Sequence, residues 1–217
     1  MPFSSPDDYL DQISRLSPYY EYFQLDFADG VLVEEKTAPL RTVLEILARL
    51  DNEKIKNCVF DIHLMEVGYE KEISVVKNYR AGLKIGRIFI HLSVLKRGFL
   101  GRKKDDFEFG LVLSPEDEVS RAEKDIDIKN VPAIQIMSVI PGAQGRPFIP
   151  ETLNKIDQLR SLNYRNKIFL DGAVNDKTLP TINSRKFKPD VVCPGSFLTK
   201  SPDNELKKRV NFLLSFE

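Results

Sequence analysis

The sequence predicts an α/β protein in which parallel strands alternate with helices and close into a (β/α)₈ barrel. From Glu21 onward, short β-branched or aromatic runs alternate with longer stretches of helical periodicity. The strand-like runs are apolar enough to be covered on both faces, as in a parallel sheet. At 217 residues, without a linker or a repeat, the chain suits one barrel domain spanning residues 1–217.

Seven runs have the character of strands, namely Tyr22–Phe27, Cys58–Leu64, Arg87–Leu92, Phe107–Leu113, Ala133–Val139, Lys167–Leu170 and Val191–Pro194. Six later stretches space their apolar residues as amphipathic helices do, namely Leu40–Leu50, Lys71–Ala81, Pro115–Lys124, Pro150–Leu162, Leu179–Ser184 and Glu205–Phe216. Pro115 and Pro150 suit the first turns of their helices.

The beginning of the chain departs from this alternation. Asp7–Leu16 predicts a helix opened by acidic residues, but Pro2–Pro6 is too short to form a full strand before it. We therefore expect the first barrel strand to be truncated or missing.

The composition is that of an ordinary globular protein, with 42% hydrophobic and 29% charged residues. Basic and acidic residues both total 32, so no overall charge draws the chain toward nucleic acid or an acidic membrane. No signal peptide and no apolar run of membrane-spanning length is evident. We expect a cytoplasmic protein with neither nucleic acid nor membrane as partner; the sequence leaves a homo-oligomer open.

Polar residues interrupt two of the predicted strands near their ends, where barrels carry their active sites. Gln24 and Asp26 are two apart and project to the same side, as do Asp61, His63 and Met65. Asp26 could simply cap a loop, and a single histidine in an apolar strand is often structural. Burying an acid, an imidazole and a thioether on one face without a ligand would nevertheless be costly.

Glycines follow the later strands. Asp171-Gly172 ends one strand, with Asp171 either a functional acid or a turn cap. Gly142, Gly145 and the pair Gly195-Ser196 follow two others, where glycine lets an anion approach backbone N–H groups closely. The basic runs Lys96-Arg97, Arg102-Lys103-Lys104 and Lys207-Lys208-Arg209 are interpreted as solvated faces.

These stretches stand in a familiar order. Gln24–Gly30, Asp61–Met65, Met137–Gly145 and Leu170–Val174 resemble the H-x-D-x-M-D-G, D-x-H-L-M, M-S-V-x-P-G and V-D-G-G-V motifs of the ribulose-phosphate 3-epimerase family. The resemblance extends from Asp26 to Ser201 and implies a TIM barrel that binds ribulose phosphate.

The resemblance also implies a reaction. One carboxylate removes the C3 proton of D-ribulose 5-phosphate, and a second returns a proton on the other face to give D-xylulose 5-phosphate; Asp26 and Asp171 match these two acids. The family's divalent metal (Zn, Fe, Mn or Co) polarises the neighbouring carbonyl, and its ligands match Gln24, Asp26, His63 and Asp171.

Further positions match the family's substrate contacts. Met65 and Met137 correspond to methionines near the reacting carbons. The phosphate of the phosphosugar is expected on backbone N–H groups at the strand ends, namely those of Gly172, Ala173, Gly195 and Ser196, with help from Gly142 or Gly145.

The sequence departs from the family's pattern in four places. Gln24 stands where the family has a histidine ligand, and a carboxamide is a poorer donor to such metals, so binding is expected to be weak or absent. Ala173 and Gln144 replace glycines. The first strand, whose serine contacts substrate, has no clear counterpart beyond Ser4 or Ser5.

Three alternatives follow. A phosphosugar-binding homologue with impaired catalysis would explain Gln24 and the missing strand, and a hexulose-6-phosphate 3-epimerase would keep the two acids. A decarboxylase or aldolase of the same barrel group ranks last, because it needs a lysine where Asp61-Ile62-His63 has histidine.

Overall fold

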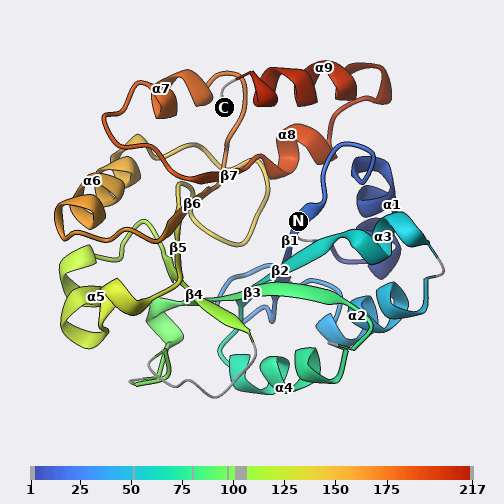
Figure 1. Cartoon of the computed structure of the whole chain (residues 1–217), viewed down its shortest axis with the longest axis horizontal. Coiled ribbons are helices and arrows are strands. Elements are labelled where there is room, and N and C mark those ends of the chain that lie inside the picture. Colours follow the sequence, from blue (N-terminus) through green and yellow to red (C-terminus); the bar gives the residue numbers. More distant parts are fainter. Residues whose placement is uncertain (1–2, 51, 80, 97, 101–106, 216–217) are drawn as a thin grey trace. The chain divides into compact units, whose positions relative to one another are not determined.

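The computed structural model describes residues 3–50, 52–79, 81–96, 98–100 and 107–215. Strands and helices alternate along the chain (Figure 1). The chain divides into two compact units, Met1–Ile90 with Asp106–Glu108, and His91–Asp105 with Phe109–Glu217. A single domain over residues 1–217 therefore stays a prediction.

The described residues of the first unit form three parallel strands. Strand β1 (Tyr22–Ala28) pairs with β2 (Val59–Met65), which pairs with β3 (Lys84–His91). The helices of this unit are α1 (Pro6–Leu16), α2 (Leu40–Arg49), α3 (Glu53–Asn57) and α4 (Tyr69–Tyr79).

The register of β1 and β2 sorts their side chains onto two faces. Gln24 lies opposite Asp61, and Asp26 lies opposite His63. Side chains alternate across a strand, so these polar residues share one face, while Phe23, Leu25 and Phe27 take the other. The pairing thus brings two predicted site residues from distant parts of the sequence to the same level.

Tyr9 connects α1 to β1 through a hydrogen bond and a ring contact. Its side chain has no exposed surface, and its hydroxyl donates to the backbone carbonyl of Asp26 at 2.6 Å. The ring stacks on Phe27 with centroids 5.4 Å apart, and the amide of Phe3 donates to the hydroxyl at 3.2 Å. Burial raises the pKa of Tyr9, so the hydroxyl keeps its proton for this bond.

In the second unit, four parallel strands are found among the residues that the structure describes. Strand β4 (Glu108–Leu113) pairs with β5 (Ala133–Met137), β5 with β6 (Lys167–Asp171), and β6 with β7 (Val191–Cys193). Its helices are α5 (Val119–Asp125), α6 (Asn154–Ser161), α7 (Leu179–Asn183), α8 (Gly195–Thr199) and α9 (Asp203–Leu214), with short 3₁₀ turns at Leu92–Val94, Ile128–Asn130 and Pro150–Leu153.

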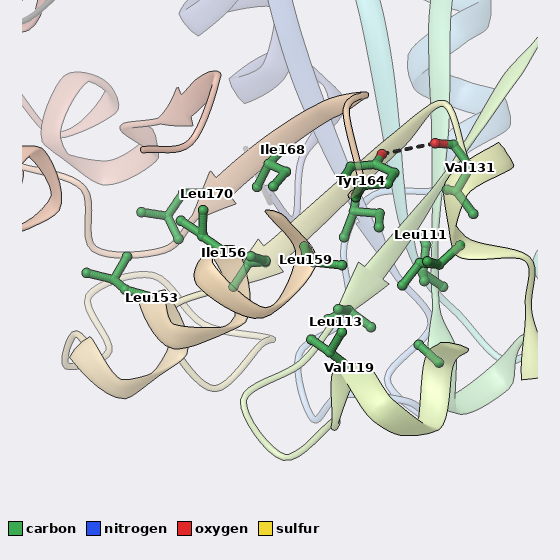
Figure 2. Packing of buried hydrophobic residues seen from close by; sticks show 14 of the residues in the cluster. Leu111, Leu113, Val119, Val131, Leu153, Ile156, Leu159, Tyr164, Ile168 and Leu170 are labelled. Atoms are coloured by element: carbon green, nitrogen blue, oxygen red, sulfur yellow. Dashed lines mark hydrogen bonds between the residues drawn. The ribbon is translucent and has the colours of Figure 1, made fainter. Parts of the chain in front are cut away.

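One face of these strands forms the core of the second unit. Figure 2 shows Ile168 and Leu170 of β6 packing with Ile156 and Leu159 of α6, and all four are fully buried. Tyr164 closes one end of this core, where its hydroxyl donates to the carbonyl of Val131 at 3.0 Å. The alternate residues of β5 and β6 therefore point to the face away from this core.

The structure confirms the seven predicted strands, each within three residues of its expected start and two of its expected end. The helices also agree, except at two starts. Pro150 opens a 3₁₀ turn, so that α6 begins at Asn154, and Pro115 does not open α5, which begins at Val119. Ser114 and Asp117 form a turn first, because the Asp117 carboxylate accepts from the Ser114 amide at 2.8 Å. Sequence reasoning also missed the short helices α3 and α8.

Residues 3–21 contain α1 and no strand, as predicted for the described part of the N-terminal segment. Ser5 caps α1, accepting from the amide of Asp7 at 3.2 Å. In the described ranges, no helix combines the length and the apolar composition that a membrane crossing requires.

Candidate active site

The candidate residues of the first unit lie on β1 and β2. Oδ1 of Asp26 is 3.1 Å from Nδ1 of His63 and accepts a hydrogen bond from Nε2 of Gln24 at 3.2 Å. Asp26 is 8% exposed and His63 1% exposed. The structure therefore brings together the predicted residues Gln24, Asp26 and His63. It also buries Met65 at the end of β2, on the same face.

Opposing effects act on the ionisation of Asp26. Burial raises the pKa of its carboxyl, while the hydrogen bond and the charge of His63 are among the effects that lower it, and the pKa lies below its ordinary value. At neutral pH the carboxylate is therefore ionised and able to accept a proton or bind a cation.

Asp61 shares the face of His63 but has a structural role. Its Oδ1 accepts from the backbone amide of Arg87 at 2.7 Å, and its Oδ2 lies 3.5 Å from the Arg87 guanidinium. The register of β2 and β3 shifts at this point, beside Gly86. A Cβ at Gly86 would lie 2.4 Å from Asp61 Oδ1, so glycine leaves the space that the carboxylate occupies.

Asp29 forms the turn after β1. Its carboxylate accepts from the amides of Val31, Leu32 and Val67, at 2.8, 3.0 and 2.9 Å. Glu66, which directly follows β2, was not singled out from the sequence. Burial, together with the charges of Glu72 and Asp29, raises its pKa to about 7.

The candidate residues of the second unit lie on β5 and β6. Asp171 ends β6 directly opposite Met137 of β5. Nε2 of Gln135 donates to Asp171 Oδ2 at 3.1 Å and reaches Sδ of Met137 at 3.5 Å. Gln135 is fully buried. Sequence reasoning missed it because it belongs to none of the motifs; the signal was a single amide within an apolar strand.

The turn that follows Asp171 is tightly constrained. Gly172 has φ 111° and Ala173 φ 50°. A Cβ at Gly172 would lie 2.6 Å from Val139 Cγ2, so this position requires glycine for both space and conformation. Ala173 adopts the left-handed region despite its side chain, at a cost of about 1 kcal/mol.

Side-chain donors fix the peptide planes of this turn. The Ser138 hydroxyl contacts the carbonyls of Asp171 and Gly172 at 3.0 and 2.6 Å, and Thr178 donates to the carbonyl of Ala173 at 2.6 Å. Each carbonyl shares a rigid plane with the next residue's N–H group. Holding the first two carbonyls therefore also sets the directions of the Gly172 and Ala173 N–H groups.

The other predicted phosphate contacts follow neighbouring strands. Asp171 pairs with Cys193, so the turn at Gly195 and Ser196, which begins α8, emerges at the same end of the sheet. Gly142 and Gly145 lie on the loop after β5 with φ 114° and 86°.

A hollow of about 570 Å³ lies beside Ser196 and Gly145. Its lining includes Lys208 and Arg209, which the sequence suggested were merely solvated. The Arg209 guanidinium donates to the carbonyl of Phe197 at 2.9 Å and to Glu205 at 2.8 Å. Its position is thus fixed next to the predicted phosphate turns. Arg97 and residues 102–104, from the other basic runs, lie outside the described residues.

Comparison with known proteins identifies the family of this chain. The model of the ribulose-phosphate 3 epimerase family matches residues 6–196. The chain belongs to this family of isomerases. It is 30% identical over 211 residues to the ribulose-phosphate 3-epimerase of Buchnera aphidicola, covering 94% of this chain and 86% of the relative. It is 25% identical over 167 residues to that of Methanocaldococcus jannaschii, covering 74% and 65%.

Solved structures show the same fold at lower identity. A thiamine phosphate pyrophosphorylase from Pyrococcus furiosus matches with TM-score 0.60 at 12% identity, covering 95% of this chain and 88% of that one. Tryptophan synthase from P. furiosus matches with TM-score 0.60 at 17% identity, covering 97% and 93%. With the alternating parallel strands and helices, these matches confirm the predicted α/β class and TIM-barrel fold.

Proposed function

We propose that this protein inverts C3 of a ketose phosphate, interconverting D-ribulose 5-phosphate and D-xylulose 5-phosphate, with Asp26 and Asp171 as the acid–base pair. The observation that carries the proposal is that this member of the epimerase family has both acids at strand ends, each held by a glutamine amide. Titratable groups with specific partners at the strand ends of such a fold are candidates for acid–base catalysis.

The two acids perform the chemistry in sequence. The ionised carboxylate removes the C3 proton, whose acidity comes from the adjacent C2 carbonyl, and leaves an enediolate. The protonated acid then delivers its proton to the opposite face of C3. The pair ends with the two protonation states exchanged, so the same residues can run the reaction in reverse.

The donor atoms also suit a divalent metal. Asp26, His63 and Asp171 each offer one ligand atom, a carboxylate oxygen or an imidazole nitrogen. These are ligand types that zinc, iron, manganese and cobalt accept, and three protein ligands suffice for an open catalytic site. When bound, such a metal would polarise the C2 carbonyl as a Lewis acid. Gln24 would be a weak or absent fourth ligand, since its amide nitrogen faces Asp26.

The phosphate of the substrate would bind at the turns after β6 and β7. Gly172, Ala173, Gly195 and Ser196 supply backbone N–H groups, with Gly142 or Gly145 on the preceding loop. The fixed carbonyls of the Gly172 turn support this proposal, because the N–H groups need no reordering when an anion arrives. Met65 and Met137 would contact the carbon chain of the substrate.

A coupled assay with D-ribulose 5-phosphate, with and without added zinc, iron, manganese or cobalt, tests the function. Asp26→Asn and Asp171→Asn should each lower turnover by about 10²–10⁴-fold. Asp11→Asn, which changes an exposed acid of α1, is the matched control and should retain parental activity. Incorporation of deuterium at C3 in heavy water reports the proton transfer directly.

Other outcomes separate the alternatives. If either Asp26→Asn or Asp171→Asn epimerises at the parental rate, the two-carboxylate mechanism is wrong. If the parent binds the phosphosugar without turnover at any metal concentration, the chain is a binding homologue, a reading that Gln24 favours. Turnover of a hexulose 6-phosphate in preference to the pentulose would reassign the substrate.

A further inference from the structure

Gln135 has a buried side-chain amide, and its nitrogen contacts two acceptors. One hydrogen of Nε2 is directed at Asp171 Oδ2, 3.1 Å away, and the other at Met137 Sδ, 3.5 Å away. Sulfur is a weak acceptor, so the carboxylate is the stronger partner. Desolvating an amide costs several kcal/mol if it makes no bonds, whereas leucine or valine would fill the same space in an apolar strand. The cost of burying this amide indicates that its hydrogen bond to Asp171 has a role.

The register explains how the contact arises. Met137 lies directly opposite Asp171, whereas Gln135 lies opposite Phe169, one step earlier on the same face. The glutamine side chain extends along that face toward the carboxyl ends of the strands, where its amide reaches the Asp171 carboxylate. Asparagine is one methylene shorter and would fall about 1.5 Å short of this contact.

The bond constrains the carboxylate's orientation. A carboxylate rotates easily about its terminal torsion. A donor held by a rigid strand fixes the position of Oδ2 and thereby the orientation of the whole group. Proton transfer between an acid and a carbon requires close alignment, and a misplacement of about 1 Å can cost roughly 10²-fold in rate.

A similar contact supports Asp26 in the first unit. Gln24 lies two residues before Asp26 on the same face of β1, and its Nε2 donates to Asp26 Oδ1 at 3.2 Å. In each unit a glutamine amide donates to the acid from a position two residues further from the strand end, with Gln24 on the same strand as Asp26 and Gln135 on the strand next to Asp171.

We propose that Gln135 is a positioning residue that orients the Asp171 carboxylate for proton transfer at C3. This inference rests on the proposed epimerase function and adds to it a residue outside the family's motifs. Gln135 acts through Asp171 and need not touch the substrate.

Gln135→Met tests the proposal, because methionine keeps the length of the side chain and removes both N–H donors. Gln158→Met, the same substitution at an exposed position of α6, is the matched control. We expect Gln135→Met to lower kcat by about 10–100-fold and to leave KM within about twofold, since the phosphate contacts are untouched. The primary isotope effect with substrate deuterated at C3 should rise, as proton transfer becomes more strongly rate-limiting.

Gln135→Asn provides a second variant that retains the amide. It should show the same fall in kcat if reach matters, and thermal unfolding of all variants checks that they are folded. Parental kcat and isotope effect in a folded Gln135→Met would overturn the inference. So would a fall in kcat that follows lost thermal stability with no change in the isotope effect.

The failure of this inference differs from that of the proposed function. If the parent turns over and Gln135→Met matches it, only the positioning role is wrong. If the parent and the Gln158→Met control both fail to epimerise any ketose phosphate, the function is wrong and the positioning role falls with it.

Discussion

Replacing Gly86 by alanine should destabilise the first unit, because the new methyl group would occupy the space of a buried carboxylate. The added Cβ would lie 2.4 Å from Asp61 Oδ1 and 3.0 Å from Val59 Cγ1. Real Cβ atoms do not approach an oxygen so closely, so Asp61 or the backbone must move. Asp61 is 7% exposed and cannot simply turn into solvent.

The magnitude follows from what the movement disrupts. Crowding a packed strand costs about 1–3 kcal/mol. Breaking the 2.7 Å bond between Asp61 and the Arg87 amide adds about 1.5–3 kcal/mol. Reduced freedom of the unfolded chain returns about 0.4–1 kcal/mol. We expect the free energy of unfolding to fall by about 2–4 kcal/mol, a large part of a typical domain's stability.

Urea denaturation of matched alanine variants measures this cost. Gly82→Ala is the control, because a Cβ there meets nothing closer than 3.7 Å, and it should be neutral or slightly stabilising. In an Asp61→Ala background, Gly86→Ala should cost at least about 1 kcal/mol less, since the clashing oxygen is gone. Equal stabilities of Gly86→Ala and Gly82→Ala would refute the reasoning.

Two further predictions concern the candidate site. Gln24→His should tighten zinc or manganese binding by about 10–100-fold, because imidazole replaces an amide that faces Asp26; calorimetric titration giving equal affinities would show that position 24 does not face the metal. Glu66→Gln should gain stability over the parent only at higher pH. Burial and acidic neighbours raise the Glu66 pKa from 4.5 to about 7, so ionising the parent's carboxyl opposes folding increasingly across that interval. In urea titrations the gain should be near zero at pH 4 and on the order of 1 kcal/mol at pH 8; an equal difference at both would contradict the assigned cause.

Local pattern was sufficient for the elements of this fold. Each strand is a short apolar run and each longer helix has an amphipathic period, and these properties depend on neighbours within one element. The exceptions were a turn that replaces the first residues of a predicted helix and a helix too short to be detected by periodicity. Asp117 bonds the Ser114 amide and delays α5 to Val119, and the five-residue helix α8 is too short to show a period.

The sequence by itself determined the family and the order of strands. It also singled out Asp26, His63 and Asp171 as candidate site residues, because the motifs place these side chains at or near strand ends. Only the tertiary structure decided their partners. Gln135 donates to Asp171, which is 36 positions away in the sequence. The carboxylate of Asp61 accepts a hydrogen bond from Arg87 and is not among the candidate metal ligands. Alternation along a strand tells which face a side chain takes, but the register between strands, set by packing over the whole sheet, decides which side chain lies opposite.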